Sequence, residues 1–322
     1  MIRLNLSKCR GFSHHRHGWA FCINALKPIH SNCGIECDDF IEKNFAWGLS
    51  NFYKKKSETN LPYKNPWIGF LHNPQNPPRW FDYSNSPEGI LSRKIFQESL
   101  RSCKCLICLS DYLADWLKTK VEVPVISVKH PTQLNCETWD ENKFLLQKVR
   151  PVVQIGYWLR NLTAIRDLRC TSKYTKIWIP SDLEYANKLL NRMRSIYPDF
   201  YEKEYMWNSV SIPDKLSNEQ FDHLMTSCVV FLDLYDSSAN NAIIECMARN
   251  TPILVNKLPA VIEYLGESYP LYYNSIDEAS DMLSDTGLIL SAHEYLKQMD
   301  KSFLSPTFFL NDICKKLEFI NA

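Results

Sequence analysis

The chain has 322 residues, of which 45% are hydrophobic and 23% charged, and its 37 basic and 36 acidic side chains give a net charge of +1 at pH 7. This length favours two domains, because single domains typically hold roughly 100–200 residues. The balanced charge argues against a nucleic-acid partner. No run approaches the roughly 20 apolar residues of a membrane span, and charges interrupt the start of the chain too early for a secretion signal. We therefore expect a cytoplasmic protein without a transmembrane segment, for which peripheral membrane contact stays open.

Cysteine usage agrees with that compartment, since several of the twelve cysteines lie within apolar patterns, as reduced core residues do. Cys103, Cys105 and Cys108 are closely spaced, but their segment alternates like a strand and has no second ligand pair, so packing is favoured over zinc. Asp233 and Asp236 are three positions apart and form no Asp-x-Asp pair. We predict no metal site.

Strand-like and helix-like segments alternate through the first half of the chain. Short apolar runs predict strands at 2–6, 66–71, 105–109 and 123–128, and helical patterns lie between them at 19–29, 86–102 and 111–117. The prolines after residue 73 end the second of these strands. The alternation predicts βαβ units and a parallel sheet.

The pattern lapses into polar sequence between 133 and 148 and then starts again. We predict a first domain at 1–145, a second at 146–302 and a C-terminal helical segment at 303–322 that can cross back to the first domain. The second series has strands at 151–156, 176–179, 209–212, 229–234 and 252–255. Helices are expected at 217–225, from about 240, before Gly266 and at 311–319. Ser217 and Gln220 form a capping box at the first of these helices.

The segment 229–266 carries the strongest functional signal. It reads as strand, polar loop, helix, strand and helix, and a parallel sheet binds ligands at the carboxyl edge where this loop lies. The free backbone N–H groups of a helix that begins near Asn240 suit a phosphate. The chain has nine glycines but neither GxGxxG nor GxxxxGK, which argues against a nicotinamide dehydrogenase and a P-loop NTPase.

Residues 216–266 resemble the donor-binding half of GT-B retaining glycosyltransferases of the family 4 type. The matching pieces, in the family's order and spacing, are LSNEQFDHLM, VVFLDLYDSS, AIIECMARNTPILV and PAVIEYLG. The resemblance implies an α/β fold of two Rossmann-like, doubly wound domains that face a cleft. It also implies transfer of a sugar from a nucleotide-sugar co-substrate to a glycan or other hydroxyl acceptor, with retention at the anomeric centre and without a separate cofactor.

The resemblance assigns the donor site residue by residue. The family carries two glutamates eight positions apart, and Glu245 matches the second, which binds the ribose hydroxyls. Ser237 stands where the first is expected, and Asp236 beside it can replace the missing carboxylate at the reacting sugar. A plain ion pair between Glu245 and Arg249, four positions on, is the competing interpretation. The remaining donor-binding candidates are Gly156, Ile212, Ser237, Ser238, Ala239, Asn240 and Asn241.

The reaction also needs a cation, because a departing nucleoside diphosphate develops negative charge. Arg160 follows the strand that ends at Gly156, and its guanidinium can clamp a diphosphate. The alternative is an ordinary surface arginine.

On the acceptor side, His72 and Asn73 directly follow a buried strand. The imidazole of His72 can bind an acceptor hydroxyl or assist removal of its proton, although a histidine packed into its loop is an equally good interpretation. Arg16, Gly18 and Trp19 follow the first strand, where the family has its acceptor loop. Trp19 can equally be a core residue.

Three other functions fit parts of the sequence. A nucleotide-sugar epimerase on the same fold would be active without an acceptor. A binding protein that has lost turnover would explain the missing glutamate at Ser237. A two-lobed small-ligand receptor of the periplasmic type is disfavoured by the many cysteines and the absence of a secretion signal.

Overall fold

The computed structural model describes residues 2–9, 11, 18–47, 61–197 and 206–321. The chain divides into two compact units, each with its own parallel sheet. Unit 1 comprises Met1–Gln133, Asp236–Ala239 and Lys301–Ala322, and unit 2 comprises Leu134–Tyr235 and Asn240–Asp300. A four-residue segment of the predicted donor loop thus belongs to unit 1, while the residues on either side of it belong to unit 2.

The sheet of unit 1 has five parallel strands in chain order: β1 (Leu4–Asn5), β2 (Ile35–Asp38), β3 (Trp67–Leu71), β4 (Cys103–Cys108) and β5 (Val125–Ser127). Strand β2 was not predicted. Its sequence, IECD, has two acidic residues in four and therefore lacks an apolar run. The other strands lie within or overlap the predicted segments.

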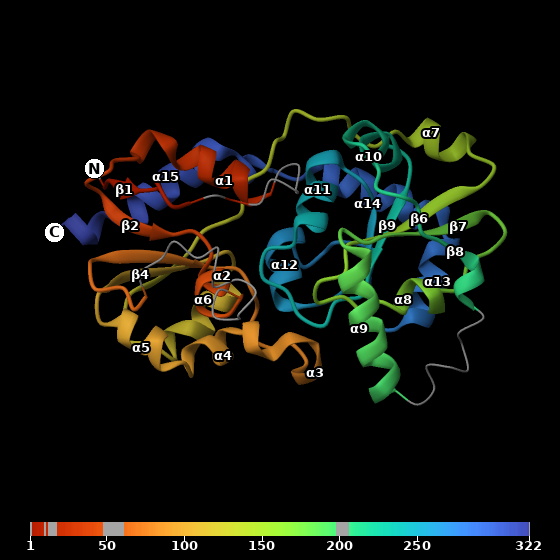
Figure 1. Ribbon diagram of the computed structural model, residues 1–322. Helices are drawn as coiled ribbons and strands as arrows, with labels where there is room; N and C mark the ends of the chain where they lie inside the picture. Colours follow the sequence, from red (N-terminus) through yellow and green to blue (C-terminus); the bar gives the residue numbers. More distant parts are fainter. Residues whose placement is uncertain (1, 10, 12–17, 48–60, 198–205, 322) are drawn as a thin grey trace. The chain divides into compact units, whose positions relative to one another are not determined.

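Helices cover both faces of this sheet (Figure 1). One face carries α1 (Trp19–Leu26) and α15 (Pro306–Lys316), and the other carries α2 (Ile41–Phe45), α4 (Pro87–Leu91), α5 (Lys94–Leu100) and α6 (Asp111–Lys118). A short helix, α3 (Arg79–Asp82), follows the loop after β3. The single helix predicted at 86–102 is wrong, because the backbone is extended at Arg93 and separates α4 from α5. Short 3₁₀ turns occupy Lys27–Ile29, Tyr83–Asn85, Ser302–Leu304 and Glu318–Asn321.

The sheet of unit 2 has six parallel strands: β6 (Arg150–Ile155), β7 (Tyr174–Ile179), β8 (Val210–Ser211), β9 (Val229–Leu232), β10 (Ile253–Asn256) and β11 (Tyr272–Tyr273). Their order in the sheet is β11-β10-β9-β6-β7-β8. The chain advances from β6 to β8 in one direction and then returns to place β9 on the other side of β6. The order therefore reverses between β6 and β9, and open parallel sheets bind ligands at such a reversal.

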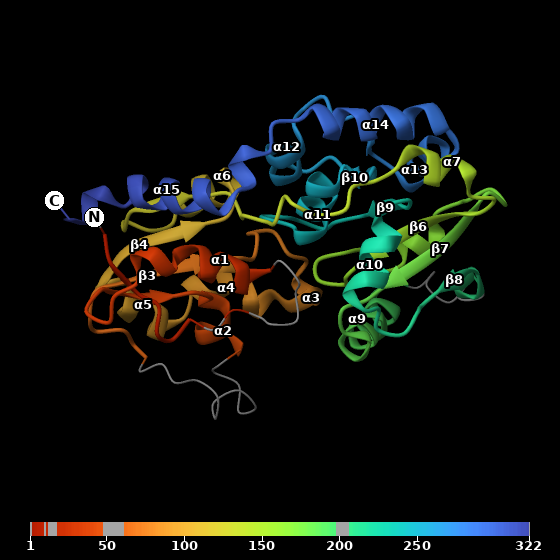
Figure 2. The ribbon, with the colours of Figure 1, turned by 90° about the horizontal axis from the view of Figure 1, so that it is seen from above.

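Unit 2 contains the helices α7 (Glu141–Leu146), α8 (Ala164–Asp167), α9 (Leu183–Ile196), α10 (Asn218–Met225), α11 (Asn241–Arg249), α12 (Pro259–Leu265), α13 (Ile276–Ser284) and α14 (Thr286–Gln298). Figure 2 shows α9 and α14 on opposite sides of its sheet. The predicted capping box is confirmed, with reciprocal hydrogen bonds between Ser217 and Gln220 at the start of α10. Among the helices of the described residues, none combines the length and apolar character needed to cross a bilayer.

Candidate functional site

Two loops meet where the strand order of unit 2 reverses. The loop after β6 and the loop after β9 pair through their backbones, since the N–H of Tyr235 donates to the carbonyl of Leu159 at 2.9 Å and Arg160 forms an antiparallel bridge with Leu234. The side chain of Asn256, at the end of β10, donates to the Leu234 carbonyl at 2.9 Å and accepts from its N–H at 2.8 Å. The carboxyl ends of three adjacent strands are thereby tied together.

The loop after β6 takes an uncommon backbone path. Gly156 has φ +78° and Leu159 has φ +54°, and a leucine in this region costs about 1–3 kcal/mol, which the buried leucine side chain helps to offset. The path folds the side chain of Arg160 back over Gly156. A Cβ at position 156 would lie 3.1 Å from the guanidinium carbon. Glycine at this position thus allows both the positive φ and the close approach of Arg160.

Arg160 is a partly buried cation that has no ionic partner among the residues the structure describes. One Nη donates to the carbonyl of Trp158 at 2.6 Å and the other to Oδ1 of Asn240 at 3.3 Å. Its Nε is buried without a hydrogen-bond partner, and no carboxylate in the described part of the chain pairs with it. Burial lowers the pKa of the guanidinium to about 10, so it stays charged at neutral pH. A desolvated charge of this kind is costly unless an anion accompanies it.

The amino end of α11 lies beside this guanidinium. Asn240 is the N-cap, and its Oδ1 accepts from the N–H of Ala242 at 3.0 Å as well as from Arg160. Asn241, the first helical residue, is exposed. The helix dipole adds partial positive charge here. The structure therefore brings together Gly156, Arg160, Asn240 and Asn241, and their contact with a diphosphate stays a prediction.

Glu245 and Ile212 lie elsewhere in unit 2. The carboxylate of Glu245 accepts from Nε of Arg249 at 3.0 Å, and the fully buried Arg249 also pairs with Asp222 at 2.8 Å. The ion pair that the sequence offered as the competing interpretation is therefore present. Ile212 directly follows β8 and is 40% exposed. Their contacts with a donor stay predictions.

Asp236 belongs to unit 1 and already has partners there. One carboxylate oxygen accepts from the N–H of Asn76 at 2.8 Å and the other from the N–H of Ser237 at 2.8 Å. Burial raises the pKa of Asp236, and these two amides and Tyr112 partly counteract that shift. To act on a donor sugar, the carboxylate would have to exchange one of these partners, so its catalytic role stays a prediction.

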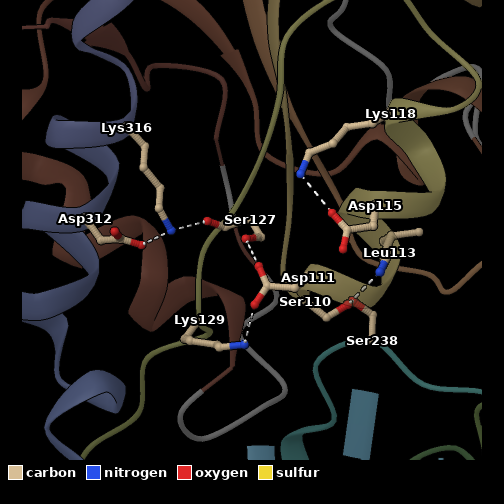
Figure 3. A network of polar contacts seen from close by, with 10 residues as sticks. All are labelled: Ser110, Asp111, Leu113, Asp115, Lys118, Ser127, Lys129, Ser238, Asp312 and Lys316. Atoms are coloured by element: carbon tan, nitrogen blue, oxygen red, sulfur yellow. Dashed lines mark hydrogen bonds and ion pairs between the residues drawn. The ribbon is translucent and has the colours of Figure 1, made fainter. Parts of the chain in front are cut away.

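Ser237, Ser238 and Ala239 pack in unit 1 as well. The hydroxyl of Ser237 donates to the carbonyl of Ser238 at 3.0 Å. The hydroxyl of Ser238 lies 3.0 Å from that of Ser110, the N-cap of α6 (Figure 3). Ala239 packs against the core beneath α1 and α15. The predicted donor loop is thus split, with its start in unit 1 and Asn240 and Asn241 in unit 2.

His72 directly follows β3, and its ring contacts two aromatic side chains. Its ring stacks on Phe40 with 3.8 Å between centroids and meets Trp19 edge-on at 4.3 Å. Its Nε2 lies 3.0 Å from the carbonyl of Asp39. A carbonyl only accepts, so Nε2 carries the proton and Nδ1 keeps a lone pair. Burial lowers the pKa of the imidazole to about 3. The ring is therefore neutral and offers Nδ1 as an acceptor for a hydroxyl.

Of the other acceptor-side candidates, Trp19 contacts this ring and Asn73 directly follows His72 in its loop. Trp19 is buried, and its Nε1 has no hydrogen-bond partner among the described residues. Gly18 is the buried N-cap of α1. The side-chain amide of Asn73 donates to the carbonyl of Asn85 at 2.9 Å. Arg16 lies outside the described residues.

Sequence analysis missed a group of buried carboxylates at the carboxyl end of β2: Asp38, Asp39 and Glu42. Asp38 accepts from the side chain of Asn44 at 2.8 Å and the hydroxyl of Tyr63 at 3.0 Å, and burial raises its pKa to about 6. The signal was the acidic sequence CDDFIE after an unrecognised strand. In the described residues, no group of three or more histidine, cysteine or acidic side chains is arranged to hold a metal ion.

Comparisons with known proteins bear on the fold. No protein-family model matches the sequence, and no curated protein matches it. Among solved structures, HepE from Anabaena in complex with UDP and glucose superimposes with a TM-score of 0.59, at 12% identity over 79% of this chain and 72% of that chain. Sucrose-phosphate synthase from Thermosynechococcus elongatus gives 0.59, at 11% identity over 89% and 74%.

A third similar structure is the trehalose-6-phosphate synthase of Burkholderia multivorans, with a TM-score of 0.55 at 11% identity over 93% of this chain and 75% of that chain. These likenesses span both units of this chain. They confirm the predicted α/β fold of the GT-B type, with its two parallel sheets.

Proposed function

We propose that this chain transfers a sugar from a nucleotide-sugar donor to a hydroxyl acceptor. The observation that carries the proposal is the partly buried guanidinium of Arg160, which no described carboxylate accompanies, beside the amino end of α11 at the strand reversal of unit 2. The GT-B fold supports it, and one similar structure was solved with UDP and glucose. UDP-glucose is therefore the first donor to test.

Arg160 and α11 have one task in this reaction. When the bond between the sugar and the diphosphate breaks, negative charge grows on the departing oxygen. The Nε–H of Arg160, which lacks a partner in the described residues, and the amino end of α11 can stabilise that charge. Both are positioned before the reaction begins, and such preorganised donors contribute most to catalysis in a desolvated site.

His72 has the complementary task on the acceptor. Its neutral ring can accept a hydrogen bond at Nδ1 from the attacking hydroxyl and so orient it. A group whose pKa is about 3 removes protons poorly at neutral pH, so orientation is the larger part of this role. Retention at the anomeric centre, independence of a metal and a cytoplasmic location belong to the same proposal and rest on the sequence resemblance and the cysteine pattern.

Calorimetric titration with UDP, GDP and ADP tests the donor site. We expect wild type to bind one of them, and Arg160→Ala to weaken that binding by about tenfold or more, as loss of a charged hydrogen bond does. Arg169→Ala is the matched control, because Arg169 is an exposed arginine of the same unit that pairs with Asp277. Failure of wild type to bind any of the three would overturn the proposal.

Turnover assays with UDP-glucose separate the rival functions. Transfer that requires an added hydroxyl acceptor supports the glycosyltransferase. Conversion of the donor sugar without an acceptor would favour an epimerase, and nucleotide binding without any turnover would favour a binding protein.

A further inference from the structure

The residue that holds the His72 loop is Glu42 on α2. Its side chain is fully buried, and its Oε1 accepts from the N–H of His72 at 2.7 Å and from the N–H of Asn73 at 2.7 Å. These two consecutive amides lie beyond the last paired residue of β3, because the pairing with β4 ends at Leu71 and Cys108. One carboxylate oxygen thus replaces the strand partners that the backbone no longer has.

The same segment of chain also holds the ring of His72. The carbonyl of Asp39 accepts from Nε2 at 3.0 Å, and the ring of Phe40 stacks on the imidazole at 3.8 Å. Residues 39–42 therefore fix His72 at its backbone, at one ring nitrogen and on one ring face. The side chain of Glu42 is the contact that sets the backbone from which the imidazole projects.

We propose that Glu42 is a positioning residue for the acceptor hydroxyl, which acts by holding the backbone of His72 and Asn73 so that Nδ1 of His72 meets the attacking group. This inference rests on the proposed transfer function. Glu42 itself touches no substrate in this arrangement.

The hydrogen bonds from the amides of His72 and Asn73 to Glu42 depend on pH. Oε2 of Glu42 is buried without a hydrogen-bond partner in the described residues, and burial raises the pKa of Glu42 to about 7. Among the described residues, two other titratable groups interact with it: the charge of Asp38 on β2 raises this pKa further, and the charge of Glu42 raises the pKa of the Cys108 thiol on β4. His72 is neutral. An ionised carboxylate accepts hydrogen bonds more strongly than a neutral acid, so the loop is held more firmly above neutral pH.

Nuclear magnetic resonance of the wild-type protein tests this hold without any substrate. The amide protons of His72 and Asn73 should shift together with a midpoint near pH 7, while the ring of His72 keeps its proton on Nε2 throughout. The titration should disappear in Glu42→Gln. Amide protons that do not titrate in wild type would overturn the proposal even if the variant fails to fold.

Kinetics tests the consequence for transfer. We expect Glu42→Gln to lower kcat by about fivefold above neutral pH, since small misplacements of a reacting group are costly, and to leave nucleoside diphosphate affinity unchanged. In the background of His72→Ala, the same change should have no further effect, because the residue that Glu42 positions is gone. A further loss of the same size in that background would overturn the positioning role.

Ser99→Ala is the matched control. The Ser99 hydroxyl is also fully buried in unit 1 and accepts a backbone N–H, that of Tyr63, at 3.0 Å. Its hydrogen bonds go to Tyr63 and Ile95 and not to His72, so its loss should lower stability and leave kcat unchanged. An equal loss of kcat in Ser99→Ala would reduce Glu42 to a packing residue. Absence of transfer in wild type would refute the proposed function, whereas the amide titration would still decide whether Glu42 holds His72.

Discussion

The carboxyl edges of the two sheets carry opposite kinds of buried polar group. In unit 2, the edge holds Arg160, a cation with no ionic partner in the described residues. In unit 1, the edge holds the carboxylates Asp38 and Glu42, whose pKa values burial raises, and the neutral imidazole of His72.

The difference indicates what each edge is suited to bind. A desolvated cation without a partner is costly, and an anion such as a diphosphate removes that cost. The neutral imidazole of His72 has no charge to attract an anion, and the lone pair on its Nδ1 accepts a hydrogen bond from a hydroxyl group. In the proposed reaction, the unit 2 edge would bind the charged leaving group and the unit 1 edge the neutral acceptor.

Substitution of Arg160 tests the proposed difference between the two sheet edges most directly. We expect Arg160→Ala to lower kcat by about 10²–10³, the usual cost of removing one donor to a developing negative charge. Arg160→Lys should recover only part of the loss, because a point charge cannot reproduce the planar fork of donors. Steady-state kinetics with UDP-glucose measures both variants. Full activity in the alanine variant would move the cation role to another residue.

The buried carboxylates of unit 1 predict the opposite pH response to that of a salt-bridged acid. The pKa of Glu42 rises on folding from 4.5 to about 7, so in this range the folded chain keeps a proton that the unfolded chain releases. The free energy of unfolding should therefore fall as pH rises between about 4.5 and 7 and stay level above, by about 3 kcal/mol for this group. Asp38 contributes in the same direction.

Urea unfolding of wild type and Glu42→Gln across this pH range measures the contribution, because the difference between the two removes the titration of all other groups. The difference in unfolding free energy should shift in favour of the variant as pH rises. A shift in favour of wild type would mean that the folded state stabilises the ionised form of Glu42.

Glu245 belongs to unit 2, the unit that is proposed to bind the donor. If its carboxylate binds the ribose hydroxyls, Glu245→Gln should weaken nucleoside diphosphate binding by about 2 kcal/mol. Asp222→Asn is the control, because Asp222 pairs with the same buried Arg249 from α10. Calorimetry and thermal unfolding should show lost stability in both variants and lost affinity only in Glu245→Gln. Equal affinities would leave Glu245 as the ion-pair partner of Arg249.

The sequence predicted most of the elements, and its failures have local causes. Most strands with apolar runs were found, whereas β2 was missed because half of its residues are acidic and β11 was missed because it has only two residues. Other helices were not predicted either, namely α2, α3, α7, α8, α9, α13 and α14. The buried residues of α9, which are Ala186, Leu189, Leu190 and Met193, follow helical spacing and could have been recognised. The break at Arg93 was not predictable from periodicity, because the apolar pattern continues through it.

Part of the candidate site could also be predicted from the local sequence pattern. Alternating strands and helices place the loops after β6 and β9 at one sheet edge, so the meeting of Arg160 with Asn240 could be expected. The positive φ of Leu159 could not, because leucine rarely adopts it and only the surrounding contacts impose it. The contact of Glu42 with His72 was not predicted because β2, the strand before Glu42, was not recognised. The contact of Asp236 with Asn76 was not predicted because the two residues lie 160 positions apart in the sequence.

The smallest effect is expected for His72, the proposed acceptor-binding residue of unit 1. If His72 orients the acceptor hydroxyl through a neutral Nδ1, His72→Ala should lower transfer by about tenfold, which corresponds to about 1.4 kcal/mol and one good hydrogen bond. The loss should be nearly independent of pH between about 6 and 8, since the pKa of the ring lies near 3. Nucleoside diphosphate affinity should not change.

His223→Ala removes an exposed imidazole from α10 and is the control. A loss of about 10²–10⁴ with an inflection near pH 6.5 would instead make His72 a general base. That outcome would require the ring to be more solvated than its stacking on Phe40 and its edge-on contact with Trp19 allow.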